Sequence, residues 1–585
     1  MHRLLSVLLA FVIACGAGCG GGTNCNNTCR SAGATQCSGP QVQTCTADAN
    51  GCLAWSAAAS CGAQRFCSAA ANACVACAGT CSSPGSTHCS GAQVQTCSAD
   101  ANGCLSLSVP AACPPGQECL SGQNRCVGPS CSTPKVVAAS APVGPSSDPG
   151  TCLRPVGQSA FPADQVQHMG TRTVGDVVSF NVAAGTGSFS IVSQAMNASA
   201  SDVTFIFGGQ DITVPNSVVP VIVSQPDGTT FYDDNAAPPS DPATALAAYA
   251  GLTPSTGAFT APNTTASLNA FDGGVPAGTW SFKVSDFAAE CASFGPGSCR
   301  DGGSATSTYD ISVLTVPARG RSSGTVDVSF YLVTNSITAA SAVSNAGMLR
   351  MLSTLETIYG RAGVCLGTVT FYDVPAWARA KFATGVAGDR TGPCDELDQM
   401  STLSIPGNTL NFFFVDDIRP SAASGIGTVV GIDGSIPGPS TFGGTVHSGA
   451  VVNASDLGHG TCGSSIDLSG CGSDVVAYIT AHEGGHWMGL YHSTESFGST
   501  FDPVADTGQC VCTQCAPVAS QPKCAANHPS LSPGQLPTQV TVADCNKGGS
   551  CDGSQFLMFW LFDATSLGQF SAQQAQIVRA NPVVH

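Results

Sequence analysis

The sequence predicts a multidomain chain with small disulfide-rich repeats, an all-β sandwich, and an α/β (or α+β) domain whose long helix carries a histidine cluster. Three observations lead to this fold class. Half of the 32 cysteines fall in two copies of one spacing pattern. Short alternating segments fill the middle of the chain, and a strand–helix–strand–strand order follows them. In addition, a chain of 585 residues is too long for a single hydrophobic core.

The composition excludes some classes of partner. Charged residues make up only 10% of the chain, and the formal net charge is −17. So acidic a chain with so few basic residues argues against a nucleic-acid partner and against a polybasic membrane patch. The cysteine density indicates an oxidising compartment, because the cytosol keeps thiols reduced.

Residues 1–19 are expected to form a lipoprotein signal peptide. Arg3 precedes an apolar run, Leu4–Ala14, which is too short for a permanent membrane span. The run ends in "VIAC", a bacterial lipobox-like sequence that makes Cys15 a candidate for lipidation. Cys19 is the alternative, since lipidation there leaves an even number of cysteines for pairing. Either site predicts contact with the membrane through an N-terminal lipid anchor, and plain secretion is the other interpretation.

Residues 25–74 and 77–126 are a tandem duplication. Every cysteine of the first copy recurs in the second at a displacement of 52 residues. Each copy has too few large apolar residues for a core and must be held by crosslinks. Zinc ribbons are the rival, but the copies add only His88 to their cysteines. We therefore interpret the duplicated copies as a spacer or adhesion module. The sequence does not determine which of their cysteines pair. The first copy's cysteines are at 25, 29, 37, 45, 52, 61, 67 and 74.

The next segments differ in composition. Residues 127–151 are rich in Pro, Ser and Ala and read as a linker. Residues 152–316 hold alternating segments between turn residues, which predicts the all-β sandwich. "VPAGTWSFKVSDFA", at 275–288, resembles a late strand of the P-domain jelly rolls attached to secreted proteases. A hinge, "VPARGRSSG", spans 316–324.

The last region, 324–585, predicts an α/β layer. "TVDVSFYLV" alternates as a strand, and Met348, Leu352, Leu355 and Ile358 recur at helical spacing. "GTVTFYDV" and "TLNFFFVDDI" give two further strands.

The stretch "HEGGHWMGLYH" within this region predicts a metal site. A spacing of four places His482 and His486 on one helix face, and Gly489 allows a turn that returns His492 as a third ligand. Three nitrogens leave one tetrahedral position of Zn²⁺ open, as in catalytic sites. Glu483 lies beside the first ligand, where a base can take a proton from the attacking water. A histidine-rich helix end by chance, or a structural zinc site, are the alternatives.

Two further features of this helix lead to expectations. Asp474 or Ser473 is expected to cap its start. Gly484 and Gly485 cost about 0.8–1 kcal/mol each against alanine inside a helix. A close approach of neighbouring groups to the helix backbone is the expected reason for them.

The motif resembles the HExxHxxGxxH signature of the metzincin zinc endopeptidases, and the resemblance extends over 324–585. It implies a methionine under the metal, for which "SQFLMFW" supplies Met558. "FDPVADT" resembles the pappalysin and cytophagalysin branch, which implies Ca²⁺ ligands at Asp502 and Asp506. Two positions depart from the pattern. Trp560 replaces a tyrosine whose hydroxyl contacts the transition state, and Gly484 replaces a large aliphatic residue.

Six cysteines between 510 and 551 follow the motif. They are interpreted as disulfides that brace a long loop, with a second metal site at "CVCTQC" as the alternative.

The resemblance implies a zinc-dependent endopeptidase that hydrolyses peptide bonds of extracellular proteins, with a protein or peptide as substrate. The rival is an adhesin or binding protein built on a catalytically inactive metzincin scaffold. Either would act at the bacterial cell envelope or surface, or as a secreted protein.

Overall fold

The structure is a computed structural model that describes residues 25–585 with gaps. The longer gaps are 154–160, 197–202, 249–255, 287–306 except 289, 388–393, 420–429 and 510–552 except 542. The other gaps span five residues or fewer, among them 319–322 and 496–500. The expected signal peptide with Cys15 and Cys19, the middle of the hinge (319–322), and the six cysteines between 510 and 551 lie outside the described residues.

The chain divides into two compact units. One comprises Met1–Ala111 with Cys119–Arg125, and the other comprises Ala112–Glu118 with Cys126–His585. Within the part of the chain that the structure describes, no helix is long and apolar enough to cross a membrane.

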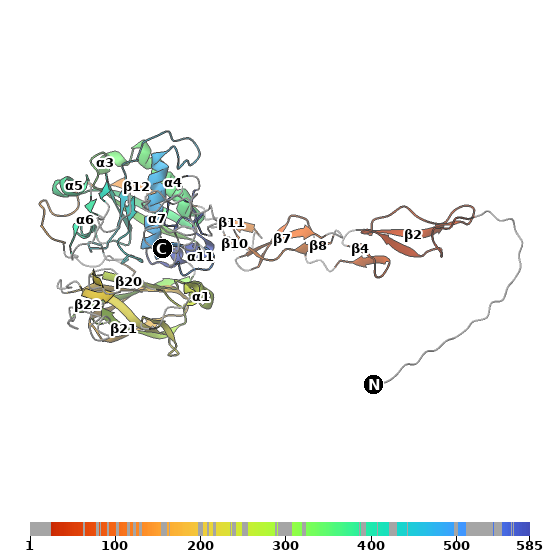
Figure 1. Cartoon of the computed structure of the whole chain (residues 1–585), viewed down its shortest axis with the longest axis horizontal. Coiled ribbons are helices and arrows are strands. Elements are labelled where there is room, and N and C mark those ends of the chain that lie inside the picture. The colour runs from red at the N-terminus through yellow and green to blue at the C-terminus, as the bar shows by residue number, and fades with distance from the viewer. Residues whose placement is uncertain are drawn as a thin grey trace, which may run out of the picture. The chain divides into compact units, whose positions relative to one another are not determined.

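Small antiparallel sheets held by disulfides make up the first unit. Each copy of the repeat contains a three-stranded core, β1-β2-β3 in the first and β6-β7-β8 in the second (Figure 1). The two cores keep the same register, since Cys37 pairs with Val42 and Cys89 with Val94. The strands of the repeat region are β1 (Thr35–Ser38), β2 (Gln41–Ala47), β3 (Leu53–Trp55), β4 (Arg65–Ser68), β5 (Ala73–Ala76), β6 (Thr87–Ser90), β7 (Gln93–Ala99), β8 (Leu105–Leu107), β9 (Ala111–Ala112), β10 (Glu118–Leu120) and β11 (Arg125–Val127).

Every disulfide described in this unit joins two cysteines of the same copy. The first copy pairs its first cysteine with the fifth and its second with the fourth, and the second copy repeats both pairings. Crosslinks therefore replace the missing apolar core. The bridges are Cys25–Cys52, Cys29–Cys45, Cys37–Cys67, Cys61–Cys74, Cys77–Cys104 and Cys81–Cys97.

The second unit contains a β-sandwich of two four-stranded sheets, as the alternating pattern predicts. One sheet has the order β13-β22-β15-β20 and the other β14-β21-β18-β19. Their inner faces meet around Trp280, which is fully buried and packs against Phe180 and Phe189. The elements are β13 (Val166–Thr173), β14 (Val177–Val182), β15 (Thr186–Ala195), β16 (Val203–Phe207), β17 (Gln210–Val214), β18 (Val218–Ser224), β19 (Thr230–Asp233), η1 (Pro242–Thr244), β20 (Thr256–Ala261), α1 (Thr265–Ala270), β21 (Gly278–Asp286) and β22 (Thr308–Pro317).

A six-stranded sheet with helices on both faces follows. Its order is β12-β24-β23-β26-β29-β28, and all neighbours are parallel except β28 and β29. Helices α4 and α7 lie side by side on one face, and α5 and α6 pack on the other (Figure 1). The strands are β12 (Lys135–Ala138), β23 (Gly324–Leu332), β24 (Val364–Asp373), β26 (Leu410–Val415), β28 (Gly431–Ile432) and β29 (Ala450–Asn453), with β25 (Val386–Ala387) and β27 (Ile418–Arg419) as a separate pair.

The helices of this layer agree with the apolar spacing. Helix α4 contains Met348, Leu352, Leu355 and Ile358, and all four are buried. The described chain is therefore multidomain and mostly β-sheet, with few helices. The helices of the α/β domain are α3 (Ala339–Ala342), α4 (Ala346–Arg361), α5 (Ala376–Phe382), α6 (Glu396–Ser401), α7 (Gly472–Trp487) and α11 (Ala572–Ala580).

The segment 127–151 is not a free linker, and that prediction is wrong. Its residues Lys135–Ala138 form β12, which pairs in parallel with β24. Disulfides Cys131–Cys365 and Cys152–Cys394 fix both sides of this segment to the α/β domain. A four-residue strand that pairs across more than two hundred positions leaves no local pattern in a Pro- and Ser-rich stretch.

The sandwich is consequently an insertion in the α/β domain. The chain contributes β12 to the large sheet, leaves to build the sandwich, and returns as β23. The α/β domain therefore includes 131–152 as well as the predicted 324–585. The sandwich also contacts the end of the chain, since the Ser188 hydroxyl donates to the Ala580 carbonyl at 2.6 Å. Its Leu268, on α1, belongs to the same apolar core as Ile577.

We expect cleavage in the hinge to leave a disulfide-linked protein. Trypsin should cut at Arg319 or Arg321, which lie outside the described residues in a Gly- and Ser-rich stretch. Cys131–Cys365 and Cys152–Cys394 then still join the two fragments. Denaturing gels should show one species without reductant and two with it.

A variant with all four of these cysteines replaced by serine is the control. Its fragments should separate without reductant. Separation of the wild-type fragments without reductant would contradict the inserted arrangement.

Candidate metal centre

Helix α7, which carries the motif, is fixed at its start by a crosslink and a buried ion pair. Cys471 is its N-cap residue and is bonded to Cys462. The expected capping by Asp474 or Ser473 is therefore wrong. The Ser473 hydroxyl instead accepts from the Gly458 amide at 3.1 Å.

Asp474 joins α7 to α4. Its fully buried carboxylate accepts from Arg350 Nε at 2.7 Å and Nη2 at 2.8 Å, and also from the Thr354 hydroxyl at 2.5 Å. The Asp467 amide adds a fourth donor at 2.8 Å. Burial alone raises the pKa of Asp474, but these donors outweigh it, so the pKa lies below its ordinary value.

The two adjacent glycines let α7 approach its neighbours closely. A Cβ on Gly484 would lie 2.1 Å from the Tyr359 hydroxyl, and one on Gly485 would lie 2.5 Å from Met558 Sδ. Both distances are shorter than van der Waals contact. The expected close approach is thus present, towards α4 on one side and towards Met558 on the other.

The helix places two histidines, and the turn after it supplies the third. Helix α7 ends at Trp487, and Gly489 has a φ of +104°, which favours glycine. His492 then returns so that its Nε2 lies 3.2 Å from His482 Nε2 and 3.2 Å from His486 Nε2. Among the described residues, this triad is the one cluster of His, Cys, Asp or Glu side chains able to hold a metal ion.

The outer nitrogen of each ring has its own acceptor. His482 Nδ1 donates to the Leu557 carbonyl at 2.7 Å, and His486 Nδ1 donates to the Leu490 carbonyl at 2.7 Å. His492 Nδ1 lies 3.0 Å from Glu495 Oε2. With the protons on Nδ1, the three Nε2 atoms carry only lone pairs and cannot hydrogen-bond to one another.

This donor set fits a zinc ion. Two nitrogens about 2.0–2.1 Å from one tetrahedral zinc lie about 3.3 Å apart, close to the 3.2 Å that separates His492 Nε2 from each of the other two Nε2 atoms. Burial, and then the neighbouring His492, lowers the pKa of His482 to about 3. The same causes lower the pKa of His486 well below its ordinary value. Both rings are therefore neutral at pH 7, as metal ligands must be.

Glu483 directly follows His482 on α7 but lies outside the donor set of the triad. Its side chain is buried and packs on β28, since a Cβ on Gly431 would lie 2.3 Å from Glu483 Oε1. Burial raises its pKa to about 8. Sequence patterns gave no sign of Gly431, because a two-residue edge strand leaves no periodicity.

Met558 packs against helix α7, since a Cβ on Gly485 would lie 2.5 Å from its Sδ, and its place under the metal stays a prediction. It is fully buried, and its carbonyl accepts from the Ser493 amide at 2.9 Å, one residue after the third histidine. The segment Leu557–Met558 thus contacts both arms of the motif. Trp560 is half-buried, and its ring packs beside Phe559. Its indole Nε1 is buried without a hydrogen-bond partner among the described residues.

The expected Ca²⁺ ligands have other partners. Asp502 accepts from the Thr507 hydroxyl at 2.7 Å and from Gln574 Nε2 at 3.0 Å. Asp506 accepts from the Ser571 hydroxyl at 2.6 Å and from the Gln573 amide at 2.9 Å. Each of the four carboxylate oxygens thus accepts one of these protein donors. The two residues hold the first turn of α11, and a calcium site there stays a prediction.

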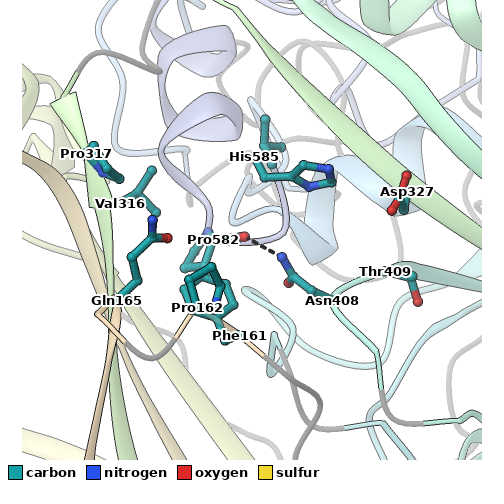
Figure 2. Close-up of a pocket in the computed structure, with 11 residues that line it drawn as sticks. Phe161, Pro162, Gln165, Val316, Pro317, Asp327, Asn408, Thr409, Pro582 and His585 are labelled. Atoms are coloured by element: carbon teal, nitrogen blue, oxygen red, sulfur yellow. Dashed lines mark hydrogen bonds between the residues drawn. The ribbon is translucent and has the colours of Figure 1, made fainter.

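A separate cavity of about 540 Å³ lies between the sandwich and the α/β domain (Figure 2). None of the three histidines lines it. Asn408 crosses its edge and donates to the Pro582 carbonyl at 3.0 Å. Its walls combine apolar side chains from the sandwich domain, such as Phe161 and Val316, with Asp327 of β23 and Thr409, which directly precedes β26.

Comparisons with known proteins add little. No protein-family model and no curated protein sequence matches the chain. Among solved structures, the chain is similar to the crystal structure of metalloproteinase-II from Bacteroides fragilis, with 11% identity and a TM-score of 0.15. The match covers 34% of this chain and 59% of that one.

We expect Gly484→Ala to destabilise the protein by about 1–3 kcal/mol, because the added Cβ overlaps the Tyr359 hydroxyl. Tyr359→Phe removes that hydroxyl, which has no hydrogen-bond partner among the described residues. The double variant should therefore recover part of the loss. Urea denaturation of the single and double variants measures the coupling.

Gly360→Ala on α4 is the matched control, because a Cβ there meets nothing within 4 Å. Its free energy of unfolding should stay the same or rise. Equal losses in Gly484→Ala with and without Tyr359→Phe would refute the close packing.

We expect Asp474 to make the protein acid-sensitive below about pH 4. Its lowered pKa means that the carboxylate stabilises the fold above the unfolded-state pKa of about 3.9. This contribution is lost as the pH falls through the folded-state value. Arg350→Ala should cost about 3 kcal/mol at pH 7, because it leaves a buried charge without its partner.

Thermal unfolding between pH 2 and 7 tests this. Arg350→Ala should lower the melting temperature at pH 7. It should also make the decrease in melting temperature from pH 7 to pH 2 smaller than in the wild type. An acid profile identical to that of the wild type would rule out the assigned role of Asp474.

Proposed function

We propose that this protein is a zinc-dependent endopeptidase of the metzincin type. The observation that carries the proposal is the triad. His492 Nε2 lies 3.2 Å from each of the other two Nε2 atoms, all three lie within 4.8 Å of one another, and each outer Nδ1 has a hydrogen-bond acceptor. Lone pairs that face one another in a buried site repel unless a cation lies between them. Glu483 beside them distinguishes a catalytic centre from a purely structural one.

His482, His486 and His492 would hold the ion. Zinc bound there supplies a Lewis acid for the scissile carbonyl. Three protein ligands leave room for a substrate, whereas structural zinc sites usually have four.

Glu483 is proposed to act as the general base. Its carboxylate takes a proton from the attacking water and passes it to the leaving amine. Burial against Gly431 raises its pKa towards the working range of an acid–base catalyst. Its position one residue after His482 keeps it near the ion without making it a ligand.

The proposed substrates are extracellular proteins or peptides. The disulfides of both units support an extracellular or secreted location, because such bridges persist in oxidising compartments. We further propose that a lipid on Cys15 or Cys19 anchors the protein to the bacterial envelope, with the repeats as a spacer.

A second candidate is an adhesin or binding protein on an inactive scaffold of the same type. Trp560 favours it, because an indole N–H cannot titrate as the tyrosine hydroxyl of the resembled family can.

Glu483→Gln separates these functions. We expect zinc content and folding to stay near the wild-type level, while cleavage of casein or gelatin falls by about 10²–10⁴-fold, the usual contribution of general acid–base catalysis. Metal analysis and a chelator-sensitive cleavage assay are the measurements. His486→Ala should instead lose the metal and part of the stability.

Glu356→Gln is the matched control. This α4 carboxylate is partly buried and, like that of Glu483, has a pKa raised by burial, and its loss should leave cleavage unchanged. Near-normal activity in Glu483→Gln would refute the base. A wild type that binds zinc and cleaves nothing would favour the binding protein.

A further inference from the structure

The three histidines differ in what holds their outer nitrogens. His482 and His486 donate to backbone carbonyls, which are neutral and fixed by the chain itself. His492 alone faces a side-chain carboxylate, that of Glu495, at 3.0 Å. The third histidine is also the one that does not lie on α7. It therefore depends most on a partner for its orientation.

The backbone between His492 and Glu495 is held in place. The Ser493 amide donates to the Met558 carbonyl at 2.9 Å, and Thr494 forms an antiparallel bridge with Phe501. The Ser493 hydroxyl also donates to the Gly553 carbonyl at 3.3 Å. Glu495 is consequently presented to His492 by two anchored residues.

Both side chains are partly exposed, at 24% for His492 and 33% for Glu495. A surface ion pair contributes little to stability, about 0–1 kcal/mol. A role in folding is thus a weak explanation for this contact. A carboxylate that accepts from the outer nitrogen of a ligand ring has a second effect, because it fixes the tautomer and makes the inner nitrogen more basic.

We infer that Glu495 is a positioning residue of the zinc site, which holds His492 in its ligating orientation and strengthens zinc binding. This inference rests on the proposed function, since it concerns the same ion. The sequence contains its signal, an HxxE spacing directly after the motif, but the spacing alone does not show that the two side chains meet.

Zinc affinity of the full chain is the test. The protein is freed of metal with a chelator and titrated with zinc in competition with a chromophoric chelator. Outer carboxylates typically contribute 10–100-fold to metal affinity. Glu495→Ala should therefore raise the zinc Kd by about 10–100-fold. Glu495→Gln, which keeps a neutral acceptor, should lie between it and the wild type.

Two further measurements distinguish positioning from a structural role. The visible spectrum of the cobalt-substituted protein should change in Glu495→Ala, because His492 is less constrained. The metal-free wild type and Glu495→Ala should melt at the same temperature. Glu356→Gln, a carboxylate remote from the triad in sequence, should match the wild type in both.

The outcomes separate the two proposals. Equal zinc affinity and equal cobalt spectra in Glu495→Ala and the wild type would overturn the role of Glu495, whatever the peptidase activity. A wild type that binds zinc without cleaving protein would overturn the proposed function, while the affinities would still decide the role of Glu495. A wild type that binds no zinc would overturn both.

Discussion

The close approach of helix α7 to the groups around it is the constraint on which the candidate centre depends. Two consecutive residues without a Cβ lie against the Tyr359 hydroxyl and Met558 Sδ, at distances that no other side chain allows. Glycine costs about 0.8–1 kcal/mol per position in a helix, so the pair weakens the helix on its own. Packing of α7 against Tyr359 on one side and Met558 on the other offsets that cost. It also fixes the position of the helix that carries His482 and Glu483.

Different interactions hold the two ends of helix α7. At its start, a disulfide and the buried Arg350–Asp474 pair fix it to α4 and to the preceding loop. Beyond its end, the positive φ of Gly489 turns the chain back, and the Leu557 and Leu490 carbonyls accept from the two helical imidazoles. The convergence of the three ring nitrogens therefore depends on contacts with a segment that is distant in the sequence, Leu557–Met558.

Much of this was predictable because it is local. Periodicity gave the strand at Val326, the helix around Leu352 and the sandwich, and spacing gave His482, His486 and His492. Long-range features were not predictable. Strand β12 is four residues long and pairs with a strand far along the chain, whereas the Pro-rich composition around it predicts a linker. The predicted N-cap of α7 is wrong for a related reason. The Asp474 side chain accepts from Arg350, which is distant in the sequence, and does not cap its own helix.

The inserted sandwich contacts the candidate centre indirectly, through the loop that holds Asp502 and Asp506 and through helix α11. Asp502 and Asp506 are the calcium ligands that the resemblance implies. They accept hydrogen bonds from the Ser571 hydroxyl, the Gln573 amide and the Gln574 side chain at the start of α11. The same loop contacts α1 of the sandwich, where the Thr265 amide donates to the Pro503 carbonyl at 3.0 Å. Helix α11 in turn packs in the core that contains Met558. The sandwich is thus tied to the floor of the candidate centre through one short loop and one helix. A substitution where the Pro503 loop contacts α1 would affect the triad only through packing. This contact therefore stabilises the site but takes no part in its chemistry.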